Sequence, residues 1–304
     1  MSFWPDGRLL VAAHDAGGAE VVAAWLRQAA GGDYSRVAFA LAGPAVRVFR
    51  GKLGVIAQVA PEEALAAVAG YDRVLTGTGW GSELERRTIA AAKEAGVKVA
   101  AYLDHWTNYR ERFVLDGDLV LPDELWAGDE HAYLLARQVF PSVPVVLEPN
   151  RYFADAVAAV REAAVPPRRG DGKRVLYICE PRTMNYGQAD YWGYTEYEAL
   201  AGYLEYLIRA AVPVEEVRVR LHPAESAGKY AAVTAKFSGA FPLTESAGTP
   251  LAADCAWADW VAGCDSMAMV IALLAGRTVY SCIPPGGRKM TLPYREIIRL
   301  FDSR

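Results

Sequence analysis

The sequence predicts two doubly wound α/β domains that face each other across a cleft. Three observations lead to this prediction. In the first half of the chain, short apolar runs alternate with helical patterns, which is the order of a parallel sheet covered by helices on both faces. Residues 165–173, with the sequence VPPRRGDGK, then interrupt the pattern as a linker. The alternation begins again after them, so we expect domains at 1–164 and 174–304.

The first domain is expected to consist mainly of buried strands with helices between them. The predicted strands are 9–13, 37–41, 55–59, 73–76, 97–103, 125–127 and 143–147. The predicted helices are 19–30, a helix that begins at 61, 83–95 and 130–139. Pro61 suits the first turn of a helix, and Gly96 suits the end of one. Continuous apolar strands of this kind need cover on both faces, which favours a parallel sheet.

The second domain repeats this order. Its predicted strands are 174–179, 214–221, 257–262 and 278–282, and its predicted helices are 194–210, 224–237, 266–275 and a short terminal helix at 293–301. In doubly wound sheets, ligands bind at the carboxyl ends of the strands. The residues that follow each strand are therefore the candidate functional residues.

Composition excludes several classes of function. The chain has 304 residues, a formal net charge of −4 and no run of Lys or Arg, so a nucleic-acid partner is not expected. The densest basic cluster lies beside the prolines and glycines of 165–173 and is interpreted as a solvated linker; it consists of Arg168, Arg169, Lys173 and Arg174. The four cysteines form no C-x-x-C pair, which favours free buried thiols over disulfides or zinc ligands.

The chain shows no targeting or membrane-spanning pattern. Residues 1–10 include Asp6 and Arg8 and no long apolar core, so no signal peptide is expected. The longest apolar region, 260–276, is interrupted by Asp265 and is too short to span a bilayer. We therefore expect a cytoplasmic protein, and the composition leaves peripheral membrane contact open.

Polar residues and glycines follow the first strand. His14 and Asp15 come directly after it, and Gly17 and Gly18 allow a ligand to approach the N–H groups of the next helix. Asp15 is placed where a general base could act, although a helix cap would explain the same residue. The pattern is not G-x-G-x-x-G, so NAD binding is disfavoured.

Two further strand ends in the first domain carry candidate residues for an acceptor. Gly79 and Trp80 belong to a glycine-rich turn at 77–82, which suits an anion or a sugar but also suits a plain flexible loop. The loop after 97–103 gathers polar and aromatic side chains: Asp104, His105, Trp106 and Tyr109. The two His-Asp pairs would be adequate metal ligands if their loops met, but a metal-independent reaction is favoured.

The second domain offers candidates for binding a nucleotide. An Arg just past a strand can hold phosphate through a bidentate fork, and a turn that opens a helix can cradle it with backbone N–H groups. His222 and Pro223 lie between a strand and a helix. The full set of candidates is Glu180, Arg182, Arg220, His222, Pro223, Gly263, Asp265 and Ser266.

The His222-Pro223 pair, followed some forty residues later by the turn 263–266, resembles the C-terminal half of bacterial GT-B glycosyltransferases. The similar families use CMP- or CDP-activated donors: bacterial sialyltransferases, capsule-type Kdo transferases and teichoic-acid polymerases. The resemblance implies a GT-B-like pair of Rossmann-like domains, with His222 and Ser266 on the phosphate and Asp15 as the general base. Those families usually carry paired Ser residues, whereas here Asp265 precedes a single Ser266.

The resulting hypothesis is a cytoplasmic glycosyltransferase that moves a sugar, such as a nonulosonic acid or Kdo from a CMP donor, to a glycan or surface-polysaccharide acceptor. Asp15 would take the acceptor proton, and no cofactor is expected besides the nucleotide-sugar co-substrate. Two alternatives stay open. One is a nucleotide-sugar 2-epimerase of the same fold, for which Glu180 becomes a catalytic candidate. The other is a non-catalytic protein that binds a sugar or a nucleotide.

Overall fold

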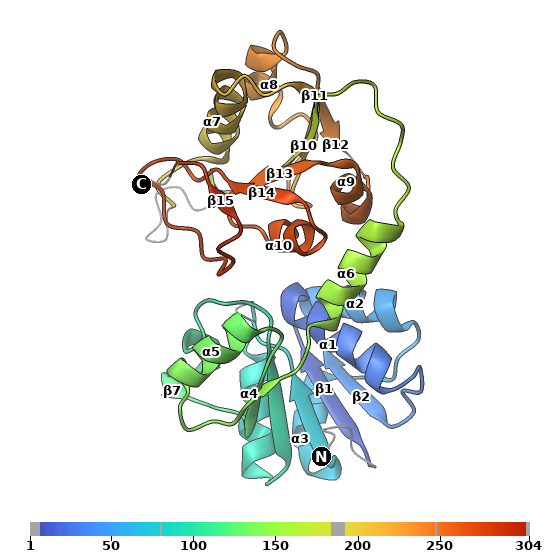
Figure 1. Cartoon of the computed structure of the whole chain (residues 1–304). Coiled ribbons are helices and arrows are strands. Elements are labelled where there is room, and N and C mark those ends of the chain that lie inside the picture. The colour runs from blue at the N-terminus through green and yellow to red at the C-terminus, as the bar shows by residue number, and fades with distance from the viewer. Residues whose placement is uncertain (1–6, 80, 184–191, 247, 302–304) are drawn as a thin grey trace. The chain divides into compact units, whose positions relative to one another are not determined.

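The computed structural model of the chain describes residues 7–79, 81–183, 192–246 and 248–301. The chain divides into two compact units, Met1–Ala154 and Asp155–Arg304. Each unit is an α/β domain built on its own sheet (Figure 1). The division falls within helix α6 (Arg151–Glu162), so the segment 165–173 belongs to unit 2.

The main sheet of unit 1 has the strand order β3-β2-β1-β4-β5-β8-β9, and all of its neighbouring strands are parallel. The order reverses at β1 and β4, which makes this pair the switch point where a doubly wound sheet opens a crevice for ligands. A small antiparallel pair, β6-β7, lies outside this sheet. The strands are β1 Leu9–Ala13, β2 Val37–Leu41, β3 Gln58–Val59, β4 Arg73–Thr76, β5 Lys98–Leu103, β6 Val114–Leu115, β7 Asp118–Leu119, β8 Glu124–Ala127 and β9 Val145–Leu147.

Helices cover both faces of this sheet. Successive side chains of β1 enter two different apolar clusters: Leu9 and Val11 pack in the cluster that contains α1 and α2, and Leu10 packs in the cluster that contains α3 and α4. All three side chains are fully buried, as expected for a strand covered on both faces. The helices are α1 Ala16–Ala29, α2 Gly43–Leu53, α3 Pro61–Ala66, α4 Leu84–Glu94 and α5 Glu130–Val139, with 3-10 turns η1 Val68–Gly70 and η2 Glu111–Phe113.

Unit 2 repeats the topology with the order β12-β11-β10-β13-β14-β15, again with parallel neighbours and a switch point at β10 and β13. The predicted class of two doubly wound α/β domains is therefore confirmed. The strands are β10 Lys173–Ile178, β11 Val214–Arg220, β12 Leu243–Ser246, β13 Trp260–Gly263, β14 Thr278–Ser281 and β15 Ile298–Arg299. The helices are α7 Glu196–Arg209, α8 Ala231–Phe237, α9 Leu251–Trp257 and α10 Met267–Leu274.

The predicted terminal helix at 293–301 is wrong. Residues 298–299 form β15 on the edge of the sheet, and the rest of this segment has no helical structure. Adjacent β-branched residues, Ile297 and Ile298, favour an extended backbone, and pairing with β14 satisfies that preference. The strand predicted at 257–262 begins only at Trp260, because Trp257 closes helix α9.

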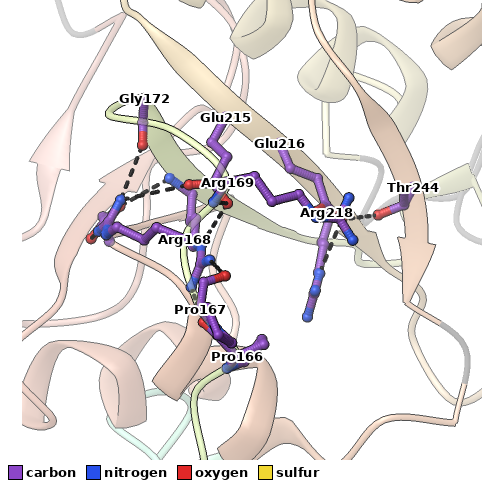
Figure 2. A network of polar contacts seen from close by, with 11 residues as sticks. Pro166, Pro167, Arg168, Arg169, Gly172, Glu215, Glu216, Arg218 and Thr244 are labelled. Atoms are coloured by element: carbon purple, nitrogen blue, oxygen red, sulfur yellow. Dashed lines mark hydrogen bonds and ion pairs between the residues drawn. The ribbon is translucent and has the colours of Figure 1, made fainter.

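The basic cluster around the linker is only partly solvated. Arg174, at the start of β10, is 2% exposed. Its guanidinium donates to the carbonyl oxygens of Pro166 and Pro167 and, through Nε, to Glu215 Oε1 at 2.9 Å. Figure 2 shows this network, in which Arg168 also donates to Gly172 O. The expectation of a solvated linker is therefore wrong for Arg174, which fastens the linker to the amino ends of β10 and β11.

Two smaller predictions concern cysteines and membranes. The cysteines are all buried and free: Cys179, Cys255, Cys264 and Cys282. This agrees with the interpretation of their spacing. No helix in the described part of the chain is long and apolar enough to cross a membrane.

Candidate active site

The candidate residues of unit 1 gather where β1, β4 and β5 end. These three strands are neighbours in the sheet, with β1 and β4 at the switch point. His14 and Asp15 follow β1, the glycine-rich turn follows β4, and Asp104 follows β5. Because the carboxyl ends of parallel strands lie on one edge, residues that are far apart in sequence come together here.

His14 and Asp15 form a hydrogen-bonded pair. His14 Nδ1 lies 2.7 Å from Asp15 Oδ1, and Gly81 N donates to Asp15 Oδ2 at 3.1 Å. Asp15 occupies the N-cap position of α1, yet its side chain makes no capping hydrogen bond. The simple helix-cap interpretation of Asp15 is therefore not what the structure shows. The two side chains are 21% and 26% exposed, so both are held by the protein and still reach solvent.

A buried carboxylate, that of Glu85, binds the backbone of this pair. Glu85, in the first turn of α4, is 4% exposed and accepts a hydrogen bond from His14 N at 2.7 Å. Burial raises the pKa of the Glu85 carboxyl group. The sequence gives no sign of this role for Glu85, because a glutamate in the first turn of a helix is usually a solvated residue that complements the helix dipole.

Asp104 is fixed by a buried guanidinium. Arg112 Nη1 donates to Asp104 Oδ1 at 2.6 Å and to Thr78 Oγ1 at 3.1 Å, so it joins the loops after β4 and β5. Arg112 is 6% exposed. Its position in η2, at the end of an irregular loop, gave no signal in the sequence. A charge this deeply buried needs a partner, and Asp104 supplies it.

The glycines at these strand ends are required by the protein's own contacts. A Cβ on Gly17 would lie 2.1 Å from Asp104 Oδ2, and one on Gly79 would lie 2.3 Å from Asp15 Oδ2. A Cβ on Gly18 would lie 3.0 Å from Thr78 N. A side chain at Gly17 or Gly79 would displace the carboxylate of Asp104 or Asp15, and one at Gly18 would press on the backbone of Thr78. Their predicted contact with an acceptor stays a prediction, and Trp80 lies outside the described residues.

The aromatic residues of the third loop pack inward. Trp106 is 6% exposed, donates from Nε1 to Asp129 Oδ2 at 2.9 Å and stacks on Phe153. Tyr109 is 3% exposed within the core. His105 Nδ1 accepts a hydrogen bond from Trp106 N. Acceptor binding through the Trp106 or Tyr109 ring would therefore require this loop to rearrange.

In unit 2, Glu180 lies just past the end of β10 and accepts hydrogen bonds from the turn that precedes α10. Glu180 Oε1 accepts from Cys264 N at 3.0 Å and from Asp265 N at 2.8 Å. Its other oxygen forms an ion pair with Arg182. Burial raises the pKa of the Glu180 carboxyl group. The structure thus brings together three of the predicted residues, Glu180, Arg182 and Asp265, at the switch point of unit 2.

The turn after β13 is fixed from both sides. Asp265 Oδ1 accepts from Thr291 N at 2.8 Å, and Asp265 Oδ2 accepts from Thr291 Oγ1 at 2.8 Å. Burial raises the pKa of Asp265. Ser266 is the N-cap of α10 and accepts from Ala268 N at 3.3 Å. Gly263, the last residue of β13, lies against Met269 and Ile178.

The remaining predicted residues surround a different pocket, at the ends of β11 and β12. It encloses about 410 Å³, and its lining includes Arg220, His222, Pro223 and Ser246. His222 and Pro223 are exposed. Arg220 Nη1 donates to Asp254 Oδ2 at 2.6 Å. Because Asp254 is fully buried, Arg220 has a structural task, the neutralisation of that charge, besides its place in the pocket wall.

No group of three or more His, Cys, Asp or Glu residues in the described part of the chain could hold a metal ion. The predicted first-domain pairs do not form such a group. Asp104 instead bonds to Arg112, and Asp15 bonds to His14 and Gly81.

No protein-family model matches the chain, and no curated protein sequence matches it. Solved structures do match. The UDP-GlcNAc 2-epimerase of Neisseria meningitidis, bound to UDP-GlcNAc, aligns with a TM-score of 0.61 and 11% identity over 92% of this chain and 84% of that chain. Anabaena HepE, in complex with UDP and glucose, aligns with a TM-score of 0.54 and 11% identity over 92% and 81%. Acinetobacter baumannii MurG aligns with a TM-score of 0.52 and 12% identity over 90% and 78%.

These similar structures have the GT-B fold, and the two Rossmann-like domains of this chain have the same fold. At 11–12% identity the similarity shows a shared fold and not a shared activity. One fold hosts many activities, and the activity depends on the site.

Proposed function

We propose that the chain is a nucleotide-sugar-dependent glycosyltransferase. The nucleotide is assigned to the strand ends of unit 2, and the acceptor hydroxyl to the strand ends of unit 1. The observation that carries the proposal is that, in both units, hydrogen-bonded carboxylates lie at or beside the switch point of the sheet: Asp15 after β1 and Asp104 after β5 in unit 1, and Glu180 and Asp265 in unit 2. The likeness to structures that hold UDP, UDP-GlcNAc or glucose supports a nucleotide-sugar ligand.

In the proposed reaction, Asp15 is the general base. The acceptor oxygen attacks the anomeric carbon, the bond from that carbon to the phosphate oxygen breaks with its electron pair going to the phosphate, and Asp15 takes the acceptor proton. His14 and Gly81 hold the carboxylate in one orientation through its two oxygens. A positioned base is typically worth about 10²–10⁴ in rate. Ser266 and Arg182, at the switch point of unit 2, are assigned to the departing phosphate, and His222, in the pocket at the ends of β11 and β12, is assigned to the rest of the nucleotide.

The donor proposed from the resemblance is a CMP-sugar of the nonulosonic-acid or Kdo type, with a glycan or surface polysaccharide as acceptor. The His222-Pro223 pair and Ser266 support this choice. The leaving group would then be a single phosphate monoester, for which a divalent metal is not required.

A 2-epimerase is the second candidate, and two observations favour it. The N. meningitidis UDP-GlcNAc 2-epimerase is similar in fold over 92% of this chain. Burial raises the pKa of the Glu180 carboxyl group, and this direction favours a group that can give and take a proton. An epimerase would convert a UDP-sugar without any acceptor, whereas a transferase would release the nucleotide only when an acceptor is present.

The test is a thermal-shift screen of the whole chain against CMP, CDP, UDP and GDP, followed by product analysis with the matching nucleotide-sugar. A ligand at 100 times its Kd adds about 2.7 kcal/mol of stability. Asp15→Asn should keep nucleotide binding and lose transfer by at least about 10²-fold. Asp118→Asn, an exposed carboxylate of the same unit, is the matched control.

Three results would count against the transferase. No shift with any nucleotide contradicts a nucleotide-sugar enzyme altogether. Conversion of a UDP-sugar without acceptor assigns the epimerase instead. Nucleotide binding with no turnover, before and after the Asp15 change, assigns a binding protein.

A further inference from the structure

A protein carboxylate occupies the turn that was predicted to cradle a phosphate. The backbone N–H groups of Cys264 and Asp265 lie between β13 and α10, and both donate to the same oxygen of Glu180, at 3.0 and 2.8 Å. Backbone N–H groups just before a helix are a favourable place for an anion. Here the chain itself supplies that anion, from the end of the neighbouring strand β10.

Arg182 provides a second, independent sign of an anion site. It is 7% exposed, its Nη2 pairs with the second oxygen of Glu180, and its Nε has no hydrogen-bond partner among the described residues. The guanidinium also lies 4.1 Å from the centre of the Trp192 ring. The Glu180 carboxylate therefore leaves a buried N–H donor of Arg182 without an acceptor in the described part of the chain, and an anionic ligand could supply that acceptor.

A phosphate and the Glu180 carboxylate compete for the same donors. Both are acceptors, and only one can lie on the N–H groups of Cys264 and Asp265 at hydrogen-bond distance. Two anions side by side in a site of reduced dielectric also repel each other. Either the carboxylate leaves when the phosphate arrives, or the phosphate binds elsewhere.

We propose that Glu180 competes with the phosphate of the ligand for one site. When no ligand is bound, the Glu180 carboxylate binds the N–H groups of the β13–α10 turn; an entering phosphate displaces it and pairs with Arg182. Glu180 thereby sets the affinity for the nucleotide and keeps the empty turn ordered. The inference rests on the proposed function only for the identity of the ligand, since any phosphate or diphosphate of suitable size would meet the same competition.

The competition predicts whether each substitution raises or lowers the Kd for a phosphate ligand. Glu180→Gln keeps the size and one acceptor oxygen but removes the charge, and Glu180→Ala frees the two N–H groups entirely. We expect the Kd for inorganic pyrophosphate to fall at least about tenfold in Glu180→Gln, a change of about 1.4 kcal/mol, and further in Glu180→Ala. Arg182→Met should raise it at least about tenfold, because the cation that receives the phosphate is lost.

The experiment is isothermal titration calorimetry on the whole chain with inorganic pyrophosphate, CDP and UDP, at fixed ionic strength. Glu205→Gln removes one exposed carboxylate of α7 and controls for net charge; its Kd values should equal those of the wild type. Circular dichroism confirms that each variant is folded. If Glu180→Ala does not fold, the nearly isosteric Glu180→Gln decides alone.

Pyrophosphate that binds folded Glu180→Gln no more tightly than the wild type, or binds no variant at all, overturns the inference. The nucleotide arms separate it from the proposed function. If pyrophosphate follows the expected order while neither nucleotide binds, the competition stands and the nucleotide-sugar proposal falls. If the nucleotides bind wild type and Glu180→Gln equally, the competition falls and the nucleotide-sugar proposal stands.

Discussion

At the scale of single residues, Gly43 fixes the room available to the His14 ring. It is the first residue of α2, with φ +52°, and a Cβ there would lie 2.4 Å from His14 Nε2. His14 is thus enclosed by Gly43, by Asp15 and, through its backbone, by Glu85. The orientation of the His14–Asp15 pair therefore depends on a residue of the next βα unit.

Gly43→Ala should displace the His14 ring and strain the backbone. We expect a loss of about 1–3 kcal/mol of stability, since an added methyl group would overpack the site and the left-handed φ disfavours alanine. Gly51→Ala is the matched control in the same helix, because its Cβ meets nothing within 4 Å and alanine favours a helix. Denaturant unfolding measures stability, and the NMR signals of the imidazole report the ring. Equal stability of the two variants would contradict this account.

The sequence predicts part of the site because position along a strand is local information. Asp15 and Asp104 follow apolar runs directly, so their place at the sheet edge follows from the pattern alone. Glu85 and Arg112 reach the same place from a helix and a 3-10 turn. Their role depends on tertiary contacts over 71 and 8 residues of sequence, which no local pattern encodes.

At the scale of elements, α7 begins with a capping box, for which the sequence has the pattern Thr-x-x-Glu at 195–198. Thr195 Oγ1 accepts from Glu198 N at 3.2 Å, and Glu198 Oε2 accepts from Thr195 N at 2.7 Å. Thr195→Ala should lower the free energy of unfolding by about 1 kcal/mol, since the N–H of Glu198 loses its acceptor, the Thr195 hydroxyl. Thr195→Ser keeps the hydroxyl and should lie near the wild type in denaturant unfolding. A Thr195→Ala midpoint equal to that of Thr195→Ser would argue against the box as the source of stability.

Buried strands such as β1 are predicted from the sequence, whereas the helices α2, α6 and α9 and the edge strand β12 are not, for a physical reason. A buried strand such as β1 is a continuous apolar run, which needs no partner to be recognised. The short helix α9 has seven residues, two helical turns, and its Asp254 is buried by contacts with β11 and β12. Segment 293–301 fails in the opposite way, because the preference of Ile297 and Ile298 for an extended backbone gives a strand only through pairing with β14.

At the scale of the whole molecule, each unit has apolar clusters of its own. Among the described residues, one cluster of unit 2 is built on β10, β11 and α7, and two clusters of unit 1 lie on the two faces of its sheet. Leu204 is fully buried in the cluster of unit 2, and Leu26 is fully buried in a cluster of unit 1. Two separate cores allow the units to differ in stability and to open separately.

Leu204→Ala should therefore weaken unit 2 alone. Removing a buried leucine side chain costs about 2–5 kcal/mol through lost burial and the cavity that remains. We expect faster amide hydrogen exchange in β10, β11 and α7, with unchanged protection in β1, β4 and α1. Leu26→Ala is the mirror control and should produce the reverse pattern. If either variant speeds exchange equally in both sheets, the two units unfold as a single cooperative structure, and the independence argued from their separate cores is wrong.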